Sequence, residues 1–186
     1  MAKLTFDERA ILAAYQRFYG ENYPAIDGQN TDAHIKAQKM CFLLSVRGVN
    51  VGDFGYSWNY HGPYSAGLQS LLRALDQHSG LVSEFYDAHQ DEYMLFSDSN
   101  KAGTLFSIKQ KELIDTLSSS LKITECGEDK RKWSELLGSI TFLGRSVLPG
   151  ADFEMVNNEL KKRKPQYNDN DYNYSAWTLL ESTGIL

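Results

Sequence analysis

Apolar side chains recur three and four residues apart over most of the chain, a spacing typical of amphipathic helices. Thr5 and Glu8 match a capping box, so a first helix is expected from about Phe6 to Phe18, with Gly20 ending it. The same reasoning predicts further helices over about residues 31–48, 65–80, 107–121, 133–143, 152–165 and 172–182. The pattern therefore predicts a largely helical protein.

Two stretches change period and predict strands. Residues 54–60 alternate aromatic with small or polar side chains, which places four rings on one face of a strand: Phe54, Tyr56, Trp58 and Tyr60. Residues 81–86 and 93–96 are expected to form a hairpin around the polar loop 87–92. Strand 54–60 could then complete a small antiparallel sheet.

The order of these elements predicts the fold class. Two helices followed by a hairpin is the order found in winged helix-turn-helix modules. We therefore predict an α-rich α+β fold in one domain, residues 1–186. It would comprise a winged-helix-like core over 31–98 with a small antiparallel β element, and a helical C-terminal part over 105–186 packed on that core.

The charge distribution disfavours nucleic acid as a partner. The net charge is −5, and the whole imbalance lies in residues 60–98, which hold one basic residue, Arg73, against six acidic ones. Because a nucleic-acid surface must neutralise phosphates, this segment suits a basic protein instead. A winged-helix transcription regulator using the helix after Ser65 is the first alternative. The one basic cluster, Lys161–Lys164, is expected to offset the negative end of a helix that stops before Pro165.

The sequence contains no motif for a metal, a cofactor or a catalytic nucleophile. Its four histidines lack metal-ligand spacing, and Cys41 stands in an apolar run that predicts a buried, inert thiol. We expect no catalytic residue and no cofactor, and an enzyme of unrecognised type is the second alternative. Two cysteines, short apolar runs and no leader pattern predict a cytoplasmic protein with no membrane contact.

The corner at residues 61–65 is the most informative segment. Pro63 restricts its own backbone and that of Gly62, so the corner should be rigid and should present neighbouring aromatic rings. It is either a helix-start corner packed under the aromatic strand or a partner-docking surface. For the second reading the candidate partner-binding residues are Trp58, Tyr60, His61, Gly62, Pro63, Tyr64, Ser65, Asp87, Asp91 and Glu92.

Residues 38–44 (QKMCFLL), followed by 59–65 (NYHGPYS) and Leu68, form a recognisable pattern. It resembles the YwgA-like and SocA-like (Panacea) domains, over about residues 31–98. The resemblance implies an antitoxin-type protein that contacts a toxin directly, or an adaptor that hands it to a protease. Ala37, where a leucine is usual, and residues 59–61 place the chain nearer the YwgA-like form, which has no settled activity. The first hypothesis is thus a non-enzymatic protein-interaction module.

Overall fold

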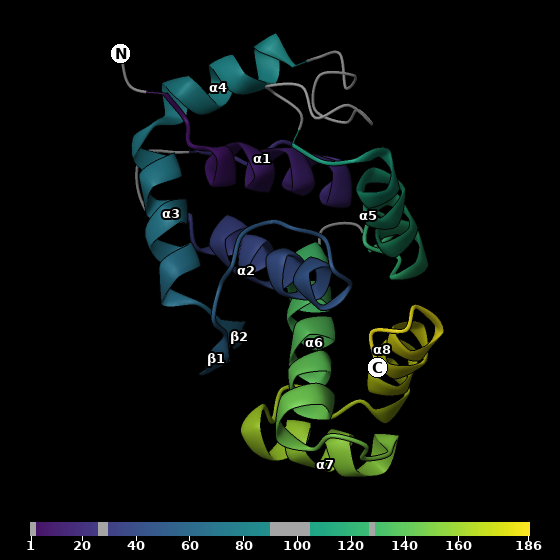
Figure 1. The fold of residues 1–186 in the computed structure, drawn as a ribbon. Coiled ribbons are helices and arrows are strands. Elements are labelled where there is room, and N and C mark those ends of the chain that lie inside the picture. Colours follow the sequence, from purple (N-terminus) through teal and green to yellow (C-terminus); the bar gives the residue numbers. More distant parts are fainter. Residues whose placement is uncertain (1–2, 26–29, 90–104, 127–128) are drawn as a thin grey trace.

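The computed structural model describes residues 3–25, 30–89, 105–126 and 129–186, and most of them are helical (Figure 1). Two long helices, α2 and α6, pack along each other more extensively than any other pair and form the centre of the molecule. The elements in chain order are α1 (Phe6–Tyr19), α2 (Thr31–Val46), β1 (Ser57–Asn59), β2 (Gly62–Tyr64), α3 (Ala66–Gln77), α4 (Ser79–Ala88), α5 (Ile108–Ser120), α6 (Lys130–Phe142), the π-helical turn η3 (Leu143–Val147), α7 (Phe153–Arg163) and α8 (Asn170–Ser182).

The expected helix boundaries are confirmed where the sequence carries caps. Thr5 and Glu8 form a reciprocal capping box at the start of α1, and Gly20 ends that helix in the left-handed conformation. Asp152 caps α7, which ends at Arg163, shortly before Pro165. These boundaries depend on neighbouring residues only, so local chemistry is sufficient to predict them.

The prediction of a strand over residues 54–60 is wrong at both ends, and Tyr60 lies in the turn that follows the strand. Only Ser57–Asn59 is extended and paired, whereas Phe54 and Tyr56 precede the strand. β1 pairs antiparallel with β2, with Trp58 opposite Pro63, so the chain turns at residues 60–61. The corner at residues 61–65 contains the second strand of a hairpin and leads directly into α3 (Ala66–Gln77), which Ser65 caps as expected.

The prediction of a strand over residues 81–86 is also wrong, because these residues belong to α4. Val82, Phe85 and Tyr86 are buried, and their spacing of three and four residues is helical. A short apolar run is compatible with either a strand or a buried helix. Here the helix buries Val82, Phe85 and Tyr86 together on one face. The companion strand 93–96 lies outside the described residues.

The fold class is confirmed in its coarser form. The described chain is α-rich with one small antiparallel sheet, β1–β2, while the winged-helix-like arrangement of 31–98 stays a prediction. Cys41 is fully buried, as expected. In the described part of the chain no helix combines the length and hydrophobicity that a membrane span requires.

Candidate functional site

Gln38 and Lys39 hold the hairpin to α2. The Gln38 side-chain amide donates to the Ser65 carbonyl and accepts from the Ser65 N–H, both at 2.9 Å. The Lys39 ammonium donates to the Pro63 carbonyl at 2.6 Å. All four residues are buried, so these bonds satisfy backbone groups that water cannot reach. The two motifs of the sequence therefore contact each other directly.

Helix α6 supports the hairpin from the other side. Gly62 has φ of +86°, and a Cβ added there would lie 2.5 Å from the Ser139 Oγ. A Cβ on Gly138 would lie 3.1 Å from the Lys39 side chain and 3.3 Å from Pro63. The backbones of β2 and α6 thus approach each other as closely as glycine permits.

The tip of the hairpin is solvent-exposed although its base is buried. Tyr60 is 75% exposed, the largest value among the described bulky hydrophobic residues. Its ring meets the His61 ring edge-on, with centroids 4.9 Å apart, and its N–H donates to the Asn59 side chain. A large ring on a fixed turn can enter a contact at little entropic cost.

A cluster of buried charges lies behind the hairpin. Glu135 of α6 accepts hydrogen bonds from Lys164 and from the His61 Nδ1–H, the latter at 3.0 Å. Arg131 reaches within 3.8 Å of the same carboxylate, and Lys164 lies over the Trp58 ring. Burial would raise the pKa of Glu135, but Lys164 and His61 outweigh it and hold that pKa below its usual value.

Lys39 belongs to the same cluster. Burial, reinforced by the charge of Lys164 and opposed by Glu135, lowers the pKa of Lys39 to about 7. Burial also lowers the pKa of Lys164, against the effect of Glu135. Near neutral pH the Lys39 amine is therefore close to its own titration midpoint.

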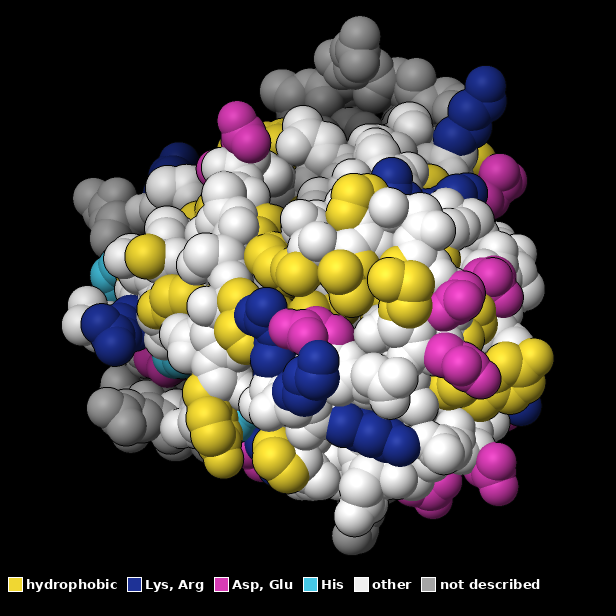
Figure 2. Space-filling model, turned by 90° about the horizontal axis from the view of Figure 1, so that it is seen from below, with side chains coloured by type: hydrophobic (Ala, Val, Ile, Leu, Met, Phe, Trp, Pro, Cys, Tyr) yellow, Lys and Arg dark blue, Asp and Glu magenta, His cyan; other side chains and the backbone are white. Residues whose placement is uncertain are grey.

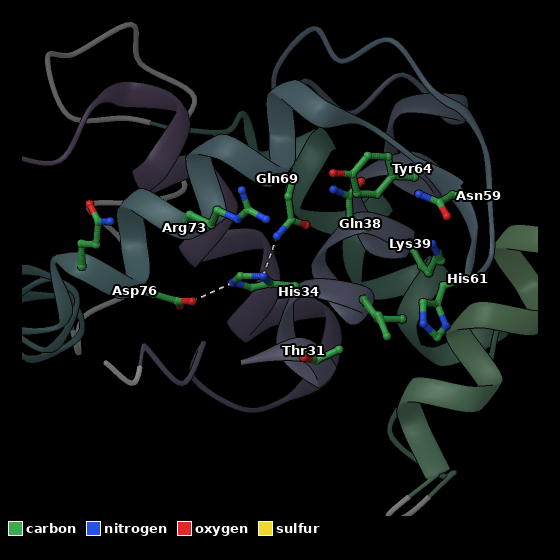
Figure 3. Close-up of a pocket in the computed structure, with 12 residues that line it drawn as sticks. Thr31, His34, Gln38, Lys39, Asn59, His61, Tyr64, Gln69, Arg73 and Asp76 are labelled. Carbon is green, nitrogen blue, oxygen red and sulfur yellow. Dashed lines mark hydrogen bonds and ion pairs between the residues drawn. The ribbon is translucent and has the colours of Figure 1, made fainter. Parts of the chain in front are cut away.

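A cavity of about 490 Å³ opens between α2, α3 and the hairpin, and we call it the α2–α3 cavity (Figure 3). Its volume is that of a typical small-molecule site. Side chains from three separate segments converge on it, and those that carry its chemistry are His34, Lys39, His61, Tyr64, Gln69, Arg73 and Asp76.

One end of the α2–α3 cavity is a closed hydrogen-bond network. The Gln69 amide donates to His34 Nδ1, and His34 Nε2 donates to Asp76 Oδ2, each at 2.8 Å. The Tyr23 hydroxyl donates to the other Asp76 oxygen at 3.0 Å. Both nitrogens of His34 and both oxygens of Asp76 are therefore occupied, which stabilises the packing of α2 on α3.

The structure brings together only part of the predicted partner-binding set. Residues 58–65 form the hairpin and its exit, with Gly62, Pro63 and Ser65 buried and Tyr60 exposed. Asp87 lies on α4 beyond the far end of α3, a 12-residue helix of about 18 Å. Asp91 and Glu92 lie outside the described residues.

Sequence reasoning assigned no place in this site to His34, Lys39, Asp76, Glu135 or Lys164, although Lys39 belongs to the quoted motif and Lys164 to the cluster expected at the end of a helix. One signal was present, because Lys39 follows Gln38 inside an otherwise apolar helix face and a lysine there needs a partner. No group of three or more His, Cys, Asp or Glu side chains within the described residues could hold a metal ion.

Comparison with known proteins returns no relative. No protein-family model, no curated protein and no solved structure matches this chain.

Proposed function

We propose that the protein is a non-enzymatic protein-interaction module of the antitoxin or adaptor type, which contacts its partner through the tip of the β1–β2 hairpin. The observation that carries the proposal is Tyr60, exposed at 75% on a turn whose base is fixed by buried hydrogen bonds. Exposed aromatic rings on rigid supports are typical centres of binding energy in protein interfaces.

The fixed base of the hairpin matters because residues that become ordered only on binding lose conformational entropy, and this loss weakens the affinity. The Gln38 and Lys39 bonds and the close approach of Gly62 to Ser139 order the hairpin before any partner arrives. The ordering cost is thereby met during folding, and contacts made by Tyr60 contribute more fully to affinity.

The charge argument for a basic partner applies to a different surface. Asp76 is buried and bonded, so it contributes no exposed charge, whereas Glu84 and Asp87 are exposed on α4. A basic partner would have to reach α4 as well as the hairpin to use this charge. We place the primary contact at the hairpin and assign α4 a steering role.

Transcription regulation through α3 is less well supported. Gln69 and Asp76 of that helix are engaged with His34, which leaves Arg73 as its single cation. In Figure 1 the helix α7 lies below the β1–β2 hairpin and α3 above it, and the end of the basic cluster packs on the hairpin, where Arg163 lies over the Trp58 ring. Figure 2 shows the lower face, where basic side chains lie beside acidic ones; Lys164 is buried and Arg163 pairs with Glu159.

Catalysis in the α2–α3 cavity is the second candidate function. The observation that favours it is the convergence of titratable side chains, His34, Lys39 and His61 among them, on one cavity. Against a role as general base, both ring nitrogens of His34 are already hydrogen-bonded. Hydrolysis of ester and amide model substrates, compared between the native protein and Lys39→Met, tests this candidate.

Site-specific photocrosslinking tests the interaction proposal. The photoreactive residue p-benzoylphenylalanine is placed at Tyr60 and, in a matched control, at Tyr174 of α8, which is 54% exposed. In cells producing the protein at native levels, position 60 should give a discrete protein adduct that position 174 does not give. Identical adducts at both positions, or none at position 60, would contradict the proposal.

With the adduct identified, substitution measures the contact. Tyr60→Ala should weaken binding of the purified partner by about 2 kcal/mol, roughly thirtyfold, because a central aromatic contact is lost. Tyr174→Ala should leave the affinity unchanged. Equal affinities of the native protein and Tyr60→Ala would place the interface elsewhere.

A further inference from the structure

The buried charges behind the hairpin do not balance. Lys39 and Lys164 are each 1% exposed, and Glu135 is the one carboxylate that acts on both of them, whereas the partly exposed Arg131 also has Asp32 as a partner at 3.3 Å. Buried ions need compensation, because transfer from water removes their hydration. Two buried lysines against one buried carboxylate leave an excess of positive charge when both lysines are protonated.

Lys39 is the cation with unused bonding capacity. Its ammonium can donate three hydrogen bonds, and the Pro63 carbonyl is its one hydrogen-bond acceptor among the described residues. Lys39 also lines the α2–α3 cavity together with His61. The His61 Nδ1–H is directed to Glu135, and its Nε2 has no hydrogen-bond partner among the described residues. Unpaired positive charge thus borders an open space.

The other end of the cavity carries a second available cation. Arg73 is exposed and makes no ion pair with any described residue. In Figure 3 its side chain lies near Gln69, away from Lys39 and His61. The acidic group at this end, Asp76, has both oxygens engaged by Tyr23 and His34 and does not neutralise Arg73.

We propose that the α2–α3 cavity binds a small organic acid, with one carboxylate at the Lys39 and His61 end and a second anionic group facing Arg73. The ligand supplies the negative charge that the buried cluster lacks. The volume of about 490 Å³ suits a small, extended dicarboxylate better than a single inorganic ion. Between the two cationic ends the neutral side chains of Tyr64 and Gln69 line the wall.

Such binding depends on pH in a defined direction. Lys39, whose pKa is about 7, holds an anion only as the ammonium, so affinity rises as the pH falls through 7. The charged groups near it are Glu135 and Arg131 of α6, Lys164 after α7, and His61 of the hairpin. His61 borders the same end of the cavity, so His61→Asn separates its contribution from that of Lys39.

The test titrates the full-length, isotope-labelled protein with glutarate and with its uncharged analogue glutaramide, in a buffer free of carboxylate and phosphate. Binding is followed by backbone amide chemical shifts at pH 6.0 and pH 8.5 at constant ionic strength. Glutarate should shift amides around the cavity and should bind about tenfold more tightly at pH 6.0. His61→Asn should retain most of this pH effect.

The exposed Arg73 and the partly buried Arg9 provide a test variant and a control outside the cavity. Arg73→Gln should weaken glutarate about fivefold, since one solvent-accessible ion pair is lost, while Arg9→Gln on α1 should have no effect. Arg73 is exposed, so its replacement leaves the fold intact. Lys39→Met should abolish the pH dependence; if it fails to fold, the pH titration of the native protein still decides.

Several results would overturn the proposal. They are equal shifts with glutaramide, affinity that does not rise toward pH 6.0, and unchanged affinity in Arg73→Gln. An acetylated, amidated Gly-Glu-Gly peptide that binds where glutarate does not would show that the cavity takes an acidic side chain of a partner instead. Tyr60 does not line the cavity, so its crosslinking result is independent of this outcome.

Discussion

The two ends of the α2–α3 cavity are built on opposite electrostatic principles. At the His34 end a closed hydrogen-bond chain runs from Tyr23 through Asp76 and His34 to Gln69, and the exposed Arg73 beside it takes no part in that chain. At the Lys39 end, cations outnumber carboxylates. A satisfied network is sufficient to stabilise packing, whereas an unbalanced one is costly unless a ligand uses it. The comparison identifies the Lys39 end as the primary anion site of the proposed ligand and Arg73 as the second contact.

Of the substitutions considered, Glu135→Gln at the Lys39 end should lower the stability of the protein most. The substitution removes the carboxylate that compensates two buried lysines and should lower the free energy of unfolding by about 4 kcal/mol at pH 7. Urea denaturation measures the loss. The exposed Glu112→Gln on α5 is the control and should change stability by less than about 0.5 kcal/mol. A loss for Glu135→Gln as small as that of the control would contradict the charge argument.

Gly62→Ala should cost about 3 kcal/mol, because it combines a positive φ with a collision against Ser139. Gly48→Ala is a matched control, since Gly48 has a similar φ of +79° and open space around it. Its cost should be about 1 kcal/mol. Ser139→Ala in the Gly62→Ala background should recover part of the loss in urea denaturation. Equal losses of stability in Gly62→Ala and Gly48→Ala would show that contact with Ser139 of α6 does not restrict residue 62.

Asp76→Asn should cost about 2 kcal/mol, because an amide cannot accept from both Tyr23 and His34 as the carboxylate does. Asp87→Asn, on the exposed face of α4, should cost nearly nothing. Binding of glutarate should survive Asp76→Asn. If Asp76→Asn kept its full stability but no longer bound glutarate, the His34 end would be the main binding end and the Lys39 end would not.

The pH dependence of stability should be the smallest effect. The pKa of Lys39 is about 7 in the folded protein and near 10.4 in an unfolded chain, so the unfolded state binds more protons between these values. Stability should therefore rise with pH from 7.0 to 8.5, by up to about 1 kcal/mol per pH unit. Lys39→Met should flatten this slope in thermal unfolding monitored by circular dichroism. If stability rose with pH equally steeply in Lys39→Met, the pH dependence would come from a titratable group other than Lys39.

Sequence reasoning succeeded where neighbours in the chain act together. The caps at Thr5, Ser107 and Asp152 lie beside the amides that they bind, so α1, α5 and α7 could be located from pattern alone. It failed for α4, because six residues of mixed character satisfy both a strand and a helix pattern, and burial of Val82 and Phe85 favours the helix.

The candidate site was predicted only in outline. The pairing of a Gln-Lys helix with a Gly-Pro-Tyr-Ser corner was visible in the sequence, and the structure supplies its cause in the bonds from Gln38 to Ser65 and from Lys39 to Pro63. Helical spacing and capping chemistry thus determined helices such as α1, α5 and α7 by themselves. The meeting of Lys39, Glu135 and Lys164 was decided by tertiary packing, because their charges lie far apart in the chain and leave no periodic trace.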